Sequence, residues 1–248
     1  MLLACKGPGL RVDKSPEELM MCFLHESFDG KFLWIISPWV SFFKLGKRLV
    51  HYPYVSSADV VDIIEALVKV GVEVRVLTRC IDDALEPGFM RLIGSVGGDG
   101  GSVPDGLRVY VREGIEEILG KINTILRLRK ILKDKLQFDF RGAGQYGRLH
   151  TKLYINENSA VIGSANFTWS GIAERGNWEC LLYYKRVENE TLYAETLSVA
   201  EAYFGNGARY EQCEELTIRK AMEYRLVDEP VVSLEDMARY LEVVKSRI

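Results

Sequence analysis

The segment from Arg148 to Thr168 holds four polar side chains whose types and spacing could form one reactive site. His150 and Lys152 are two residues apart, so on a β-strand their side chains would point to the same face. Ser164 and Asn166 have the same spacing further along. If the two stretches pair, Lys152 and Asn166 can donate to phosphoryl oxygens while the imidazole serves as nucleophile or acid. The pattern predicts chemistry on a phosphate group.

Turn-forming residues separate the two stretches. Residues 156–159 (Asn-Glu-Asn-Ser) form a cluster typical of a turn, and the apolar run from Ala160 to Ile162 begins a returning strand. We therefore expect a hairpin that brings the two pairs of polar residues to one place.

The order HxK, an acid and GSxN resembles the HKD signature of the phospholipase D superfamily. The positions that match are His150, Lys152, Gly163, Ser164 and Asn166. In layout the resemblance extends over residues 31–185, although only 148–179 is specific to the motif. It implies a phospholipase D-like α-β-α sandwich with a mixed central sheet. It also implies phosphodiester hydrolysis through a phosphohistidine on His150. No cofactor is expected, and no metal is expected either, because one histidine without HExxH or an aspartate pair does not make a metal site.

In this superfamily a glutamate downstream of the motif supports the histidine. Glu179 and Glu174 compete for that role, and Glu179 fits better because it follows Asn177-Trp178 and precedes an apolar strand.

The acid of the motif departs from the superfamily pattern. Either Glu157 stands at this position, with the turn before Gly163 one residue shorter, or Asn156 replaces the acid at the usual spacing. The resemblance implies that this residue mainly organises the turn. We expect altered hairpin geometry rather than lost activity.

The number of motifs also differs, because superfamily enzymes need two and this chain has one. Neither His25 nor His51 can begin another, since Ser27 and Pro53 stand where a lysine is required. We therefore expect a homodimer in which two copies of His150 share one site.

A basic segment leads into the motif. Nine basic residues lie between Lys121 and Lys152, opposed only by Asp134 and Asp139. On charge alone a solvated helix face is a slightly better reading than a site for an anionic partner. With the motif beside it, the segment favours a nuclease acting on DNA or RNA. We expect the substrate to contact Arg127, Arg129, Lys130, Lys133, Arg148 and Trp169, the last by stacking on a base.

The rest of the sequence predicts alternating helices and strands, an α/β pattern. Helices are expected at 16–28, 115–135, 188–204 and 211–224. A further helix is expected after an N-cap at Ser57, and another from residue 234 onward, with Ser233 as its N-cap. Strands are expected at 31–37, 72–76, 107–111 and 179–184. The glycine-rich stretch 94–106 is expected to be a surface loop.

The predicted domains are a catalytic domain over residues 1–205 and a helical C-terminal extension over 206–248. From Val187 to Ile248 there are 13 acidic and 7 basic residues. The helices of this acidic tail could bind a partner protein.

Composition narrows the class of protein. An apolar fraction of 48% and a charged fraction of 27% exclude a disordered chain. No apolar run is long enough to span a membrane, and no secretory signal is recognised, so membrane insertion is not expected. Five scattered cysteines without a CxxC pair favour reduced thiols in the cytoplasm.

Two alternative functions stay open. One is a lipid phosphodiesterase of the same superfamily with the same chemistry. The other is a catalytically silent scaffold, against which the intact set of His150, Lys152 and Asn166 argues.

Overall fold

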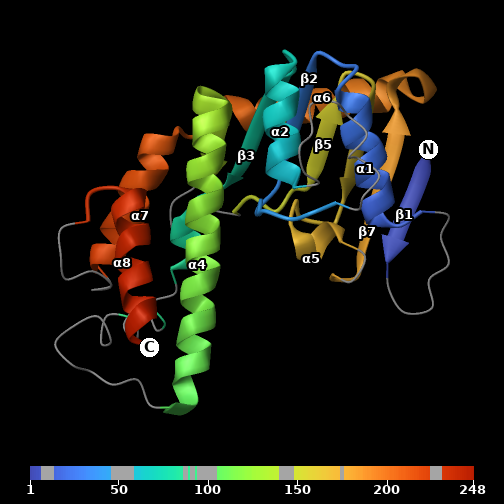
Figure 1. Cartoon of the computed structure of the whole chain (residues 1–248). Helices are drawn as coiled ribbons and strands as arrows, with labels where there is room; N and C mark the ends of the chain where they lie inside the picture. Colours follow the sequence, from blue (N-terminus) through green and yellow to red (C-terminus); the bar gives the residue numbers. More distant parts are fainter. Residues whose placement is uncertain are drawn as a thin grey trace. The chain divides into compact units, whose positions relative to one another are not determined.

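The computed structural model describes residues 1–6, 14–45, 59–85, 89, 93, 105–139, 148–173, 176–223 and 231–248. The chain divides into two compact units, whose elements are drawn in Figure 1. The first unit comprises Met1–Arg79 and Ile131–Gly207, and the second comprises Cys80–Lys130 and Ala208–Ile248.

A seven-stranded sheet forms the centre of the first unit, in the order β1-β7-β6-β5-β2-β3-β4. The neighbours β2, β3 and β4 are parallel, and the remaining pairs are antiparallel. This mixed sheet confirms the predicted α/β class. The strands span Leu2–Lys6 (β1), Phe32–Ile36 (β2), Glu73–Arg79 (β3), Leu136–Asp139 (β4), Leu153–Asn156 (β5), Ser159–Gly163 (β6) and Glu179–Lys185 (β7).

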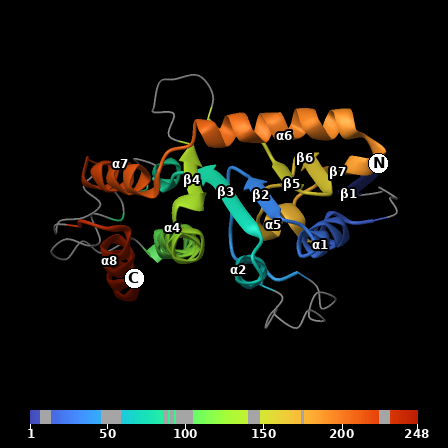
Figure 2. The ribbon, with the colours of Figure 1, turned by 90° about the horizontal axis from the view of Figure 1, so that it is seen from above.

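Helices cover both faces of this sheet, as expected for a sandwich. The helices α1 (Pro16–Ser27) and α2 (Val60–Lys69) lie on one face, and α6 (Glu190–Gly205) lies along the other (Figure 2). Trp34 and Leu77 of the sheet pack in one core cluster with Tyr193 and Phe204 of α6. The burial of these large side chains fixes the sheet beneath α6.

The sequence predicts the start of α1 correctly but not that of α2. Ser15 accepts a hydrogen bond from the Glu18 N–H, and the Glu18 carboxylate accepts one from the Ser15 N–H, which is a capping box. In α2 the cap is Asp59, whose carboxylate accepts from the Val61 N–H at 2.9 Å. The predicted cap, Ser57, lies outside the described residues.

The second unit is helical. It contains η2 (Ile81–Ala84), most of α4 (Asp105–Leu132), α7 (Tyr210–Glu223) and α8 (Leu234–Arg247). Ser233 caps α8 as predicted. The expected extension over 206–248 nearly coincides with one part of this unit, but the unit also takes residues 80–130. The domain boundary at residue 205 stays a prediction.

The strand predicted over residues 107–111 is wrong, because these residues form the first turns of α4. Val111 and Ile115 are buried at helical spacing, whereas Val109 and Tyr110 are 66% and 56% exposed. Short apolar runs do not distinguish a strand from a helix, and here the run continues the buried stripe of the following helix. Residues 94–104 of the expected glycine-rich loop lie outside the described ranges.

The prediction of reduced thiols is also wrong. Disulfides join Cys5 to Cys180 and Cys80 to Cys213, and Cys22 is the remaining thiol. The partners are 175 and 133 residues apart in sequence, so spacing along the chain does not reveal them. Because the expected cytoplasmic location rested on reduced thiols, it loses that support.

None of the described helices has both the length and the apolar character needed to cross a bilayer.

Candidate active site

The topology gathers the motif at one edge of the sheet. β2, β3 and β4 end at this edge, β6 and β1 also end there, and β5 and β7 begin there. His150 and Lys152 directly precede β5, and Ser164 directly follows β6. The hairpin of β5 and β6 therefore confirms the predicted convergence of strand ends. We call this side of the sheet the motif edge.

The imidazole and the ammonium of the motif are in direct contact. Lys152 Nζ lies 3.1 Å from His150 Nδ1 and 3.3 Å from Nε2, and it donates to the His150 carbonyl oxygen at 2.7 Å. The Lys152 side chain is buried, whereas His150 is exposed. A fixed cation thus lies against a ring that solvent and substrate can reach.

Two residues of neighbouring strands hold the backbone just before His150. Arg79 Nε, at the end of β3, donates to the Leu149 carbonyl oxygen at 2.6 Å. The Asp139 carboxylate, at the end of β4, accepts from the Leu149 N–H at 2.5 Å. The backbone before the motif is therefore fixed by the ends of two strands, which lie 70 and 10 residues away in sequence.

Ser164 and Glu179 form the second contact pair of the motif edge. The Ser164 hydroxyl donates to the Glu179 carboxylate, and the Ser164 N–H donates to the Cys180 carbonyl oxygen at 3.0 Å. β6 and β7 approach so closely that a Cβ at Gly163 would lie 2.2 Å from that carbonyl oxygen. The glycine of the motif is thus required by packing of the two strands.

Glu179 acts electrostatically on Lys152. Burial lowers the pKa of Lys152, Glu179 opposes this by raising it, and Arg79 adds to the lowering. Among the described residues no hydrogen bond joins Glu179 to His150, so the expected support of the histidine by Glu179 stays a prediction. The competing residue, Glu174, lies outside the described ranges.

Asn166 is held by its backbone and is not hydrogen-bonded to the histidine or lysine. Tyr154, which is buried in β5, donates its hydroxyl to the Ala165 carbonyl oxygen at 2.6 Å. A Cβ at Gly171 would lie 2.2 Å from the Asn166 carbonyl oxygen, so the following turn packs closely. The Asn166 Oδ1 atom is buried and has no partner in the described part of the chain. The expected donation from its amide to a phosphate stays a prediction.

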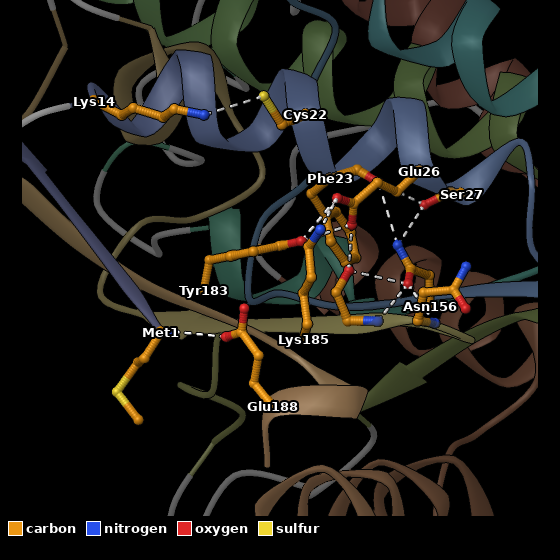
Figure 3. Close-up of polar contacts among 12 residues, drawn as sticks. Met1, Lys14, Cys22, Phe23, Glu26, Ser27, Asn156, Tyr183, Lys185 and Glu188 are labelled. Atoms are coloured by element: carbon orange, nitrogen blue, oxygen red, sulfur yellow. Dashed lines mark hydrogen bonds and ion pairs between the residues drawn. The ribbon is translucent and has the colours of Figure 1, made fainter. Parts of the chain in front are cut away.

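Asn156 organises the turn of the hairpin. Its Oδ1 atom accepts from the N–H groups of Asn158 and Ser159 at 2.9 and 2.8 Å. Its Nδ2 atom donates to the Phe23 carbonyl oxygen at 3.2 Å and to Ser27 Oγ at 3.1 Å, both on α1 (Figure 3). The side chain is fully buried. Asn156 therefore has the turn-organising role that the superfamily gives to its acid.

Glu157 does not have that role. Its carboxylate accepts from the Lys31 N–H at 2.9 Å and forms an ion pair with the Lys31 ammonium at 3.2 Å. These contacts hold the pKa of Glu157 below its ordinary value. The residue belongs to the surface at the edge opposite the motif. Of the two sequence alternatives, the geometry favours Asn156.

We predict that Asn156→Asp destabilises the fold, although it restores the residue type of the superfamily. A carboxylate cannot donate to Phe23 and Ser27, and it places an unpaired charge in a buried site. The expected loss of unfolding free energy is about 1–3 kcal/mol, measured by chemical denaturation. Glu157→Asp is the matched control and should change it by less than about 0.5 kcal/mol. Equal stability of Asn156→Asp and the wild type would contradict this role.

A cavity of about 560 Å³ lies near the motif edge in the first unit. The Tyr203 hydroxyl is 2.6 Å from Thr151 Oγ1, next to His150, and links the cavity to the motif. The cavity is lined by Leu77, Asp139, Val199, Ala202, Tyr203, Asn206 and Gly207. The Asp139 carboxylate in its wall suits a sugar or base better than a phosphate.

The remaining predicted substrate residues are spread over both units. Arg129 stacks on the Tyr210 ring at 3.7 Å and forms an ion pair with Glu211 at 3.5 Å, both within the second unit. Arg127 and Lys130 belong to the same unit, and Lys133 and Arg148 to the first. Trp169 is 51% exposed at the start of the short helix α5 (Trp169–Ile172). Their contact with a substrate stays a prediction.

Sequence reasoning missed three charged residues of the motif edge, namely Lys6, Arg79 and Asp139. Each is the last residue of its strand, β1, β3 or β4. A charged residue directly after an apolar strand is the available signal. Which strands end at one edge depends on the strand order, and the sequence did not provide that order.

A family model built from known proteins agrees with the motif. The family model described as "Cardiolipin synthase, PLD-like domain" matches residues 47–204. Among solved structures, NucT from Helicobacter pylori is similar at 13% identity, covering 79% of this chain and 92% of that chain with a TM-score of 0.45. The phospholipase D family member Nuc from Salmonella typhimurium is similar at 15% identity, covering 84% and 95% with a TM-score of 0.41. No curated protein matches the chain.

Proposed function

The chain belongs to the phospholipase D-like superfamily, and from that premise we propose that it is a metal-independent phosphodiesterase acting through a phosphohistidine, most simply a nuclease. The observation that carries the proposal is the contact of the Lys152 ammonium with an exposed His150 imidazole. An exposed ring can reach phosphorus, and the buried cation beside it can neutralise the developing charge.

The reaction proceeds in two displacements. The imidazole of one His150 attacks phosphorus and forms a P–N bond, while the P–O bond to the leaving alkoxide breaks. A second imidazole protonates that alkoxide, because its high pKa makes an acid necessary. The same imidazole then takes a proton from water, the hydroxide attacks phosphorus, and the P–N bond breaks to release a phosphomonoester.

Since the chain carries one motif, the second imidazole comes from a second copy of the chain. A twofold-symmetric dimer supplies it with no further sequence. Light scattering at micromolar concentration should report a dimer. A monomer whose specific activity is unchanged on dilution would contradict this arrangement.

Charge and exposed aromatic surface support a nucleic acid as substrate. The basic segment 121–152 precedes the motif, and Trp169 presents an exposed ring suited to stacking. The description of the matching family model names a lipid-metabolising enzyme, cardiolipin synthase. This name favours a phosphatidyl substrate as the second candidate. Partner binding through the acidic helices α7 and α8 is a separate prediction that either activity permits.

One panel tests the proposal. Single-stranded DNA, duplex DNA, RNA and phosphatidylglycerol vesicles are incubated with the wild type and with His150→Ala, each with and without excess EDTA. We expect cleavage of nucleic acid by the wild type alone, at a rate that EDTA leaves nearly unchanged. Turnover of the lipid alone would replace the nuclease by the second candidate. Activity lost in EDTA and restored by a divalent ion would overturn the mechanism.

We predict that neutralising Arg127, Arg129, Lys130 and Lys133 together weakens nucleic-acid binding. The slope of log affinity against log salt should fall by up to about 0.9 for each lost duplex contact. Because phosphate contacts do not read bases, the loss should be similar for different sequences. The control neutralises four basic residues of the first unit outside the basic segment, namely Lys31, Lys69, Lys185 and Arg186. An unchanged slope in the first variant would mean that the basic segment is a solvated helix face and does not bind the substrate.

The pH dependence should report the charge on Lys152. Glu179 raises the pKa of Lys152 against the effect of burial. In Glu179→Gln that pKa falls further, so the ammonium loses its proton at lower pH. The alkaline limb of kcat/KM should therefore move to lower pH than in the wild type. The control is Glu188→Gln, because Glu188 lies just beyond the other end of β7. This variant should leave the alkaline limb of kcat/KM at the pH of the wild type. A limb that moves to higher pH would contradict the assignment.

A further inference from the structure

Lys6 is a buried charge that the reaction described above does not use. It ends β1, which is the edge strand of the sheet, and its side chain is only 9% exposed. Its Nζ atom donates to the carbonyl oxygens of Ala173 at 2.5 Å and Ser170 at 3.2 Å. Burial of an ammonium is unfavourable unless the group is paired, so the burial of Lys6 on an edge strand needs an explanation.

The two carbonyl groups belong to the turn that follows Asn166. The Ser170 carbonyl oxygen also accepts from the Asn177 N–H at 2.6 Å. A Cβ at Gly176 would lie 2.1 Å from this oxygen and 2.8 Å from Lys6 Nζ, so the chain closes tightly over the ammonium. Lys6 thereby holds Ser170 and Ala173, and Ser170 in turn binds the backbone of Asn177, two residues before Glu179.

Lys6 also faces Glu179. The two residues are paired in the register of β1 and β7, and directly opposed residues of antiparallel strands point to the same face of the sheet. Burial lowers the pKa of Lys6, and the negative charge of Glu179 opposes that shift. Glu179 acts in the same way on Lys152, so its negative charge favours the protonated form of both buried lysines.

The neighbouring residues keep this pairing in place. Cys5 and Cys180 are also partners in the register, and the disulfide between them joins β1 to β7 one residue away from Lys6 and Glu179. β1 cannot slide along β7 while this bond is intact. The fixed register of β1 therefore places the Lys6 ammonium at the motif edge.

We propose that Lys6 is a positioning residue for the reaction, holding Glu179 and the 170–173 turn in place for Ser164 and Lys152. The inference rests on the proposed phosphodiesterase function. Lys6 does not contact the substrate, because its ammonium is enclosed by backbone carbonyl groups. It acts through Glu179, whose carboxylate accepts a hydrogen bond from the Ser164 hydroxyl and stabilises the charge of Lys152.

The test uses the full chain with Lys6→Met and Lys6→Gln, and bis(p-nitrophenyl) phosphate as a small diester. Both variants should lower kcat by about 10- to 100-fold with little change in KM. Lys6→Gln keeps hydrogen-bond donors without the charge and guards against loss of folding, which thermal melts monitor. Lys185→Met is the matched control, since Lys185 ends β7 at the opposite edge and is exposed. It should behave as the wild type.

A double-mutant cycle with Glu179→Gln separates positioning from general stability. If Lys6 acts through Glu179, adding Lys6→Gln to Glu179→Gln should lower kcat little further. The proposal would be overturned if the fold-loss in kcat of the double variant equalled the product of the two single losses. It would also be overturned if a folded Lys6→Gln variant had the kcat of the wild type. These outcomes leave the phosphodiesterase function standing as long as the wild type is active and His150→Ala is not. If the wild type hydrolyses no diester, both proposals fail together.

Discussion

His150→Ala should abolish phosphodiester hydrolysis. In the proposed dimer this one change removes both the nucleophile and the acid, because each site uses two copies of the same imidazole. The expected loss in kcat is about 10⁴-fold or more, measured under single-turnover conditions. His150 is exposed, and Lys152 is the one hydrogen-bond partner of its ring among the described residues, so the thermal midpoint should stay near that of the wild type.

The control for this variant is His25→Ala. His25 is exposed in the last turn of α1, away from the motif in sequence. It should leave kcat unchanged, which shows that loss of an exposed imidazole is not harmful in itself. A His150→Ala variant that keeps even a tenth of the wild-type rate would exclude the phosphohistidine route.

Lys152→Met should have the second largest effect. The ammonium lies beside both ring nitrogens of His150, and no other cation is in contact with that ring among the described residues. Its loss removes a preorganised positive charge at the point where negative charge develops on phosphorus. We expect kcat to fall by about 10²- to 10³-fold, as when an oxyanion donor is deleted.

Lys152→Arg is an informative companion. A guanidinium carries the same charge, but its planar fork does not fit a site shaped for a compact ammonium with one short backbone acceptor. It should recover little of the lost rate. Full recovery by arginine would mean that the charge alone matters and that the contact geometry described here does not.

The sequence predicted the motif and its hairpin because both are local. His150, Lys152 and Ser164 lie within fifteen residues, and period-two spacing with a turn between two apolar runs is sufficient to place them together. The identity of the turn organiser was not decided by spacing. It required the contacts of Asn156 with α1, more than a hundred residues earlier in the chain.

What the sequence did not predict depends on long-range pairing. Lys6 reaches Glu179 only because β1 joins the sheet beside β7, and Arg79 reaches Leu149 only because β3 lies near β5. The two disulfides depend on the same kind of closure. The strand expected at 107–111 failed for a local reason, since a short apolar run suits a strand and a helix equally well.

The phosphohistidine is the central claim, and trapping it is the most direct test. The wild type is mixed with a diester labelled on phosphorus, quenched in base within one turnover, digested and analysed by mass spectrometry. The account predicts label on the peptide that contains His150, stable in base and lost in acid, and no label in His150→Ala. Label on any other residue, or a wild type that turns over with no labelled peptide at any time, would contradict it.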